Sequence, residues 1–257
     1  MPVLILFYAQ YLNATSKKVC RMNFRVSALA VIGIYCIGQF LFTGYFMFRS
    51  KAMPSQSFAG KSELGDKSKT LLRVFLTGDS VAAGVGASGF ETSLAGRLAT
   101  GLSADHYVIF TNAAKSGNKM ADMTTVPDRQ QDVIVLFVSS NDLFHFTGLK
   151  KFEADTSAAL VRYSKLSKKV VIVGPADIGG ATAIPLIVKP IYAMQWPKYA
   201  AVIRNAAAKY DNVKYIYPAE YKEKLKTYGH TEAVDGFHPN DNGHRFWADL
   251  ILSEIQK

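Results

Sequence analysis

The sequence predicts a three-layer α/β/α fold with a central five-stranded parallel sheet, preceded by one apolar helix near the N-terminus. From residue 71 onward, short apolar runs alternate with longer amphipathic segments. Several of the short runs are nearly continuous Val, Ile and Phe, which is typical of strands covered by helices on both faces. Separately, residues 26–48 form a stretch of 23 residues without a formal charge. The alternation favours a parallel sheet between two helical layers.

The apolar stretch at 26–48 is long enough to cross a membrane. As a helix it would measure ~35 Å, against a hydrocarbon core of ~30 Å. Four basic residues lie between positions 17 and 25, and two, Arg49 and Lys51, follow the stretch. The positive-inside rule therefore places the N-terminus in the cytoplasm and the rest of the chain on the extracytoplasmic side. A cleaved signal peptide is the alternative, but the run exceeds a usual signal h-region and no Ala-x-Ala site follows it.

The flanking segments complete the predicted organisation. Residues 1–25 are the cytoplasmic N-terminal segment, and residues 1–21 are interpreted as an over-extended gene start because Met22 would suit a signal anchor. Residues 49–70 are polar and predict a linker. Residues 71–257 form the globular domain, a length that suits one domain.

Charge and cysteine usage narrow the function classes. The formal net charge is +10, and half of this excess lies in residues 1–49, which hold five basic residues and no acidic one. The other lysines come in scattered pairs without aromatic residues between them, so we expect solvated surface and no nucleic-acid partner. The two cysteines, Cys20 and Cys36, would lie ~24 Å apart on a helix, beyond disulfide reach.

The predicted elements follow in order. The strands are expected at 71–77, 106–111, 133–138, 170–173 and 213–216, and the helices at 91–102, 152–166, 197–209 and 242–255. In such sheets, binding groups collect beyond the carboxyl ends of the strands. Ser80 follows the first strand, Gly117 the second and Asn141 the third. Residues 178–196 interrupt the pattern, since Pro185 and Pro190 argue against a long helix there. A loop that caps the core is favoured slightly over an acyl-chain groove or a lid.

Three residue types point to acyl-transfer chemistry. Ser80 lies on the turn after an apolar strand, and Asp235 and His238 lie three residues apart far downstream. Serine, histidine and aspartate are the side chains that nucleophilic acyl transfer requires. Positions i and i+3 face the same way in one turn of chain, so the carboxylate can reach the imidazole.

Four short blocks resemble the SGNH (GDSL) hydrolase family of esterases and lipases, over almost the whole of residues 71–255. The blocks read Gly78-Asp79-Ser80, Asn112-Ala113-Ala114-Lys115-Ser116-Gly117, Ser139-Ser140-Asn141-Asp142 and Asp235-Gly236-Phe237-His238-Pro239-Asn240. Ser139 departs from the family pattern, which usually has glycine there. The resemblance implies a flavodoxin-like SGNH fold without cofactor or metal.

The resemblance also implies a role for each site residue. Ser80 would be the nucleophile, His238 would take its proton, and Asp235 would orient the imidazole. The oxyanion hole would consist of the backbone N–H groups of Ser80 and Gly117 and the side-chain amide of Asn141. Such donors meet negative charge only as the tetrahedral intermediate forms.

Two alternatives use some of the same residues. The run from Gly84 to Gly89 matches a dinucleotide fingerprint, but it starts seven residues beyond the strand and has no acidic partner for a ribose. A metal site built from Asp235, His238, Asp241 and His244 lacks zinc-site spacing. Both are disfavoured.

The sequence therefore predicts a membrane-anchored serine esterase that hydrolyses acyl or acetyl esters of lipids or envelope glycans through an acyl-serine intermediate. Its expected partners are a small-molecule, lipid or glycan ester and the membrane. The alternatives are an O-acyltransferase that acts on an envelope glycan with the same triad, and a binding module without turnover. Asp79 and Asp142 are interpreted as turn or capping carboxylates, and the histidines other than His238 as ordinary.

Overall fold

The computed structural model describes residues 27, 29–46, 48–49, 58–138 and 140–257. The chain divides into two units, Met1–Tyr45 and Phe46–Lys257, which are described separately. The N-terminal helix contains the apolar stretch Leu29–Phe46, whose 18 residues are not buried within the protein. At 1.5 Å per residue it measures ~27 Å, so its length and composition allow it to span a membrane. The predicted gene start at Met22 lies outside the described residues.

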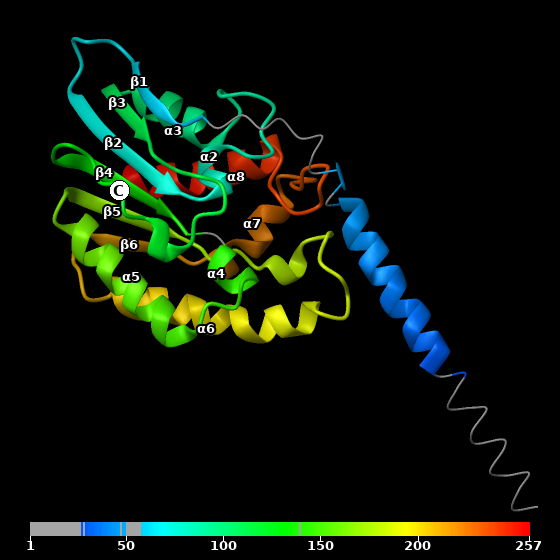
Figure 1. The fold of residues 1–257 in the computed structure, drawn as a ribbon. Helices are drawn as coiled ribbons and strands as arrows, with labels where there is room; N and C mark the ends of the chain where they lie inside the picture. Colours follow the sequence, from blue (N-terminus) through cyan, green and yellow to red (C-terminus); the bar gives the residue numbers. More distant parts are fainter. Residues whose placement is uncertain (1–26, 28, 47, 50–57, 139) are drawn as a thin grey trace, which may run out of the picture. The chain divides into compact units, whose positions relative to one another are not determined.

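The C-terminal unit is built on a six-stranded sheet with the order β1-β3-β2-β4-β5-β6 (Figure 1). The strands are β1 (Gly60–Leu64), β2 (Leu71–Gly78), β3 (Tyr107–Asn112), β4 (Gln131–Phe137), β5 (Ser167–Val173) and β6 (Val213–Ile216). Strands β2 to β6 are parallel to one another. They are the five predicted strands, in the flavodoxin-like order.

Strand β1 corrects the predicted linker 49–70 and the predicted strand count. It pairs antiparallel with β3, with Gly60 opposite Asn112 and Leu64 opposite Val108. Its sequence, GKSEL, is mostly exposed and has a single large apolar residue. An edge strand that buries little has no need of an apolar pattern, so the sequence gives no strand signal there.

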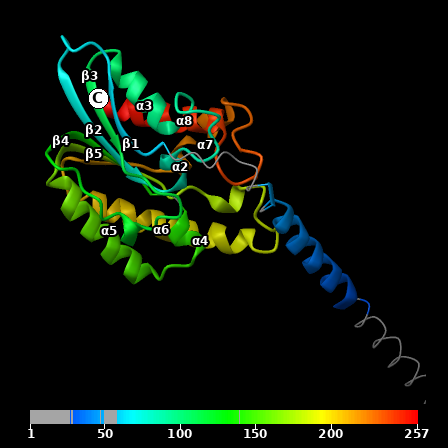
Figure 2. The same cartoon turned by 45° about the horizontal axis from the view of Figure 1, so that its top comes forward.

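Helices cover both faces of the sheet, as predicted (Figure 2). The helices are α2 (Ser80–Ala83), α3 (Leu94–Ser103), α4 (Asn141–Phe144), α5 (Leu149–Ser164), α6 (Lys189–Ala207), α7 (Lys222–Lys226) and α8 (Asp241–Ile255), with 3-10 turns η1 (Met120–Asp122), η2 (Ile178–Gly180) and η3 (Pro218–Tyr221). Because alternate strand residues face opposite sides, Val74 and Leu76 pack with α3 and α8. Phe75 packs with α5 and α6.

Helix α6 corrects the expectation for residues 178–196. It begins at Lys189, eight residues before the predicted start at 197. Pro190 lies in its first turn, where the missing N–H would have no helical acceptor in any case. The irregular part is thus residues 181–188, which follow η2. Tyr192 and Trp196 then pack into the core. This burial stabilises the helix although Pro190 lies in its first turn.

Candidate active site

Ser80 lies on a tight turn between a buried strand and a short helix. β2 ends at Gly78, Asp79 is the N-cap of α2, and Ser80 is the first residue of that helix. The Asp79 carboxylate accepts a hydrogen bond from the backbone N–H of Val81 at 3.1 Å. The Ser80 residue is only 6% exposed. Its backbone N–H, at the first helical position, has no acceptor within the helix.

The loop before α8 brings a carboxylate and an imidazole to this serine. His238 Nδ1 lies 2.6 Å from Asp235 Oδ2, and His238 Nε2 lies 3.0 Å from Ser80 Oγ. The other carboxylate oxygen, Asp235 Oδ1, accepts the backbone N–H groups of Phe237 (3.1 Å) and His238 (3.0 Å). Residues 158 positions apart in sequence therefore form one hydrogen-bonded row, in the order that the sequence predicted.

The electrostatics of this row favour an ionised aspartate. Burial alone raises the pKa of the Asp235 carboxyl, but the hydrogen bond and charge of His238, together with two backbone N–H groups, outweigh it and hold the pKa below its ordinary value. A buried carboxylate that accepts three hydrogen bonds is stabilised in its charged form. It can therefore orient the imidazole and compensate a positive charge on it.

The predicted oxyanion donors lie on two loops that meet beside Ser80. Gly117 has a positive φ of +85°, and a Cβ added there would meet open space. Among the described residues, its N–H donates to no protein acceptor. The loop is held to the end of β2 because Lys115 N and the Asn118 side-chain amide both donate to the carbonyl oxygen of Gly78, each at 3.1 Å.

Asn141 begins α4 at the carboxyl end of β4. Its Nδ2 donates to Asn118 O at 2.9 Å and has a longer contact, 3.3 Å, with Asp79 Oδ2. The first bond fixes the amide, and the second lies beside the turn that carries Ser80. Asn118, which the sequence reasoning missed, thus links the Gly117 loop both to β2 and to Asn141. The sequence feature that could have identified Asn118 is its position directly after Gly117. The departure noted at Ser139 lies outside the described residues.

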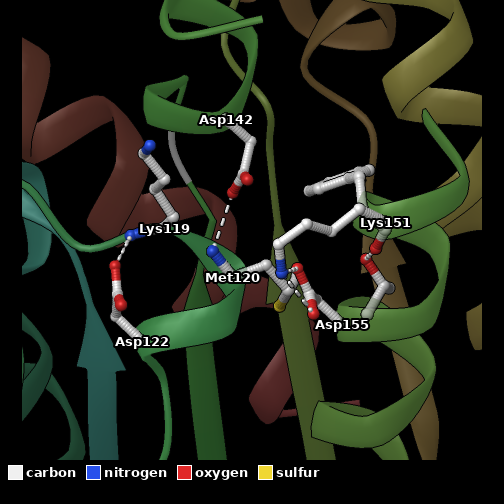
Figure 3. Close-up of polar contacts among 8 residues, drawn as sticks. Lys119, Met120, Asp122, Asp142, Lys151 and Asp155 are labelled. Atoms are coloured by element: carbon white, nitrogen blue, oxygen red, sulfur yellow. Dashed lines mark hydrogen bonds and ion pairs between the residues drawn. The ribbon is translucent and has the colours of Figure 1, made fainter. Parts of the chain in front are cut away.

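Asp142 also links these two loops (Figure 3). Its Oδ2 accepts the backbone N–H of Met120 at 2.7 Å, while Oδ1 has no hydrogen-bond partner in the described part of the chain. Burial raises the pKa of this carboxyl, and the Met120 N–H opposes the rise. Two exposed contacts flank it: the backbone N–H of Lys119 donates to the Asp122 carboxylate, and Lys151 forms an ion pair with Asp155. Asp142 therefore holds α4 against η1 and does not cap its own helix.

The residues of the two disfavoured alternatives, the dinucleotide fingerprint and the metal site, make structural contacts in this fold. Gly86, within the glycine-rich run, has a φ of +94°, and a Cβ there would come within 2.1 Å of Pro239 O, next to His238. Asp241 accepts hydrogen bonds from Ser88 N (2.8 Å) and Ser88 Oγ (2.7 Å). His244 accepts from Leu94 N at 3.2 Å and contacts Val85 O at 3.0 Å. These groups hold the loop after α2 against α8.

A cavity of about 420 Å³ opens at the row formed by Asp235, His238 and Ser80, and Ser80 and His238 both contribute to its wall. Phe237, Trp247 and Leu225 supply much of the apolar wall, and Lys222 lies at its side. A cavity of this size accommodates a small ester group. The arrangement of serine, imidazole, carboxylate and convergent N–H donors can form and stabilise a tetrahedral acyl intermediate.

Comparisons with known proteins identify a family and similar folds. The profile of the GDSL-like Lipase/Acylhydrolase family matches residues 76–246. The acetylxylan esterase Axe2 from Geobacillus stearothermophilus shares 20% identity at a TM-score of 0.59, covering 75% of this chain and 97% of that one. LAE5, an alpha/beta hydrolase enzyme from the metagenome of Lake Arreo, Spain, shares 16% identity at a TM-score of 0.59, covering 73% and 96%. These structures establish the similarity of fold. No curated protein sequence gives a significant match.

Proposed function

The chain belongs to the GDSL-like lipase/acylhydrolase family and is a carboxylic-ester hydrolase of the SGNH type, and we propose that it works through an acyl-serine intermediate on Ser80. The observation that carries this proposal is the unbroken row from Asp235 through His238 to Ser80 Oγ, with separations of 2.6 and 3.0 Å. Both distances lie within hydrogen-bonding reach, as general-base activation of a serine requires.

The proposed first half-reaction forms the acyl-enzyme. Ser80 Oγ attacks the ester carbonyl carbon while its proton passes to His238 Nε2, and the carbonyl oxygen becomes an oxyanion. The N–H groups of Ser80 and Gly117 and the amide of Asn141 donate to that oxyanion; for Asn141 the 3.3 Å contact with Asp79 is the one that substrate replaces. His238 then returns the proton to the departing alcohol as the C–O bond breaks.

The second half-reaction repeats these steps with water. His238 Nε2 takes a proton from a water molecule, whose oxygen attacks the acyl carbon. The protonated His238 then gives this proton to Ser80 Oγ as the bond between Ser80 Oγ and the acyl carbon breaks, which releases the carboxylic acid. Asp235 remains ionised throughout, and its charge stabilises the imidazolium that forms in each half. No metal or redox group is required to balance the reaction.

We also propose that the N-terminal helix anchors the enzyme in a membrane with the hydrolase domain on the extracytoplasmic side. The apolar stretch Leu29–Phe46 has the necessary length, and the basic residues are biased to its N-terminal side. Residues 1–25 would be cytoplasmic, and the hydrolase domain would begin with β1. The substrates would then be acyl or acetyl esters of lipids or envelope glycans. Protease accessibility of the domain in intact cells tests this: protection of the domain contradicts the orientation.

The chemistry is tested with the full chain reconstituted in lipid nanodiscs. We expect turnover of p-nitrophenyl acetate and butyrate, loss of turnover in Ser80→Ala, and labelling of Ser80 by a fluorophosphonate. Equal rates in the wild type and in Ser80→Ala would contradict the proposal, as would a label that maps to another serine. An acyltransferase would instead consume the ester faster when a glycan acceptor is added.

A further inference from the structure

Asp142 is a buried carboxylate that the proposed reaction steps do not use. It is 2% exposed and lies in the first turn of α4, directly after Asn141. Its Oδ2 accepts the backbone N–H of Met120 at 2.7 Å, whereas its Oδ1 has no hydrogen-bond partner among the described residues. Burial of a carboxylate oxygen without a partner destabilises a fold. Such a group calls for an explanation other than the stability of the fold.

Two hydrogen bonds join the start of α4 to the segment that follows Gly117. Asn141 Nδ2 donates to Asn118 O at 2.9 Å. Asp142 Oδ2 accepts from the backbone N–H of Met120, two residues further along the same segment (Figure 3). One bond alone would leave the segment free to turn about it. The two bonds together fix both the distance and the orientation of the segment relative to α4.

Other contacts hold the two ends of this segment to different elements. Near its start, Asn118 Nδ2 donates to Gly78 O at the end of β2, at 3.1 Å. At its end, Met123 O accepts the hydroxyl of Tyr163 on α5, at 2.9 Å. Within the part of the chain that the structure describes, the bonds from Asn141 and Asp142 are the hydrogen bonds between residues 117–123 and α4.

The two joined elements carry two of the three proposed oxyanion donors. Gly117 lies directly before Asn118, and Asn141 is the first residue of α4. The separation of the Gly117 N–H from the Asn141 amide therefore depends on how the segment is held against α4. Oxyanion donors act through their placement, and a displacement of about 1 Å can cost ~10²-fold in rate.

We propose that Asp142 is a positioning residue for the reaction at Ser80, because its bond to the Met120 N–H keeps the Gly117 N–H and the Asn141 amide at the separation that receives the oxyanion. This inference rests on the proposed function. Asp142 is not part of the cavity wall at Ser80. It therefore acts through Met120 and Asn141 and not on the substrate.

The test uses variants of the full chain in nanodiscs. Asp142→Leu removes the acceptor with a side chain of similar size, and Asp142→Asn keeps an acceptor oxygen for the Met120 N–H. Asp122→Leu is the matched control, because Asp122 accepts the neighbouring N–H of Lys119 at 2.9 Å but is exposed and makes no bond to α4 (Figure 3). Asn141→Ala, alone and combined with Asp142→Leu, completes a double-mutant cycle. Hydrolysis of p-nitrophenyl acetate gives kcat and KM, and fluorophosphonate labelling to completion counts the folded sites.

We expect Asp142→Leu to lower kcat per labelled site by about tenfold to a hundredfold and to leave KM within about threefold, because the donors act in the transition state. In Asp142→Asn, kcat should stay within about fivefold of the wild type, and in Asp122→Leu within about twofold. In the Asn141→Ala background the loss caused by Asp142→Leu should be at least about threefold smaller, since one of the donors that Asp142 places is already absent.

Several outcomes would overturn the positioning role. These are equal losses in Asp142→Leu and Asp122→Leu, a higher KM with unchanged kcat, and the full loss of kcat from Asp142→Leu in the Asn141→Ala background. If Asp142→Leu does not fold, Asp142→Ala replaces it in every comparison. Failure of both variants to fold would assign Asp142 to the fold alone. Equal turnover by the wild type and Ser80→Ala would instead defeat the proposed function itself.

Discussion

Two Asp-x-x-His motifs lie six residues apart in this chain and have different surroundings in the fold. Asp235 and His238 lie in the loop before α8, where the imidazole faces a carboxylate and a serine hydroxyl. Asp241 and His244 lie on α8, where the carboxylate faces Ser88 and the imidazole faces the backbone of Leu94 and Val85. His244 is fully buried, whereas the His238 side chain is 20% exposed. The two Asp-x-x-His motifs have the same spacing, so they differ only in the groups that the fold places around them.

The largest expected difference separates the two histidines. His238→Gln should lower kcat by about 10⁶, because the serine loses its base. His244→Gln should leave turnover within tenfold of the wild type and lower the free energy of unfolding by about 1–3 kcal/mol, since buried backbone partners lose their hydrogen bonds. Ester kinetics and denaturant unfolding, followed by tryptophan fluorescence, measure both. A comparable loss of kcat in both variants would contradict the different roles of His238 and His244.

The next largest difference separates the two aspartates. Asp235→Asn should lower kcat by about 10⁴ with the fold intact, because the amide favours the wrong imidazole tautomer. Asp241→Asn weakens the contact with Ser88 and should alter kcat less than tenfold. Steady-state kinetics of the two variants, with circular dichroism as a check on folding, make the comparison. A near-normal rate in Asp235→Asn would remove this carboxylate from the proposed mechanism.

The smallest expected effect is a pH dependence of stability that comes from His244, the buried histidine of the second motif. Burial lowers the pKa of His244 to about 4, below the usual value of 6.5. The unfolded chain therefore binds more protons between these values, so the free energy of unfolding should decrease as pH falls from 6.5 towards 4. His244 alone should account for about 3 kcal/mol of this decrease. Unfolding at several pH values in the wild type and in His244→Gln tests the slope: an equally steep dependence in the variant would assign the effect to other groups.

The sequence predicted most of the fold because β2 to β6 are short apolar runs and the long helices between them are amphipathic. It failed at β1, whose GKSEL sequence buries almost nothing, and at the start of α6, where burial of Tyr192 and Trp196 overrides the proline signal. The three residues of the hydrogen-bonded row, Asp235, His238 and Ser80, were predicted from their types and order. Their neighbours were not, because the contact of Asn118 with Asn141 depends on how two loops meet.

The segment just before β1 bears on how this enzyme can be shortened for solution work. Phe58 N donates to Ala83 O at the end of α2, the Asn112 side chain donates back to Phe58 O, and the Phe58 ring packs edge to face on Phe90. A truncation at Leu71, the first residue of the first predicted strand, would therefore loosen α2, which begins at Ser80, and leave the β3 edge open to pairing between molecules. A form that begins a few residues upstream of Phe58 would keep both the contacts that support α2 and the covered edge.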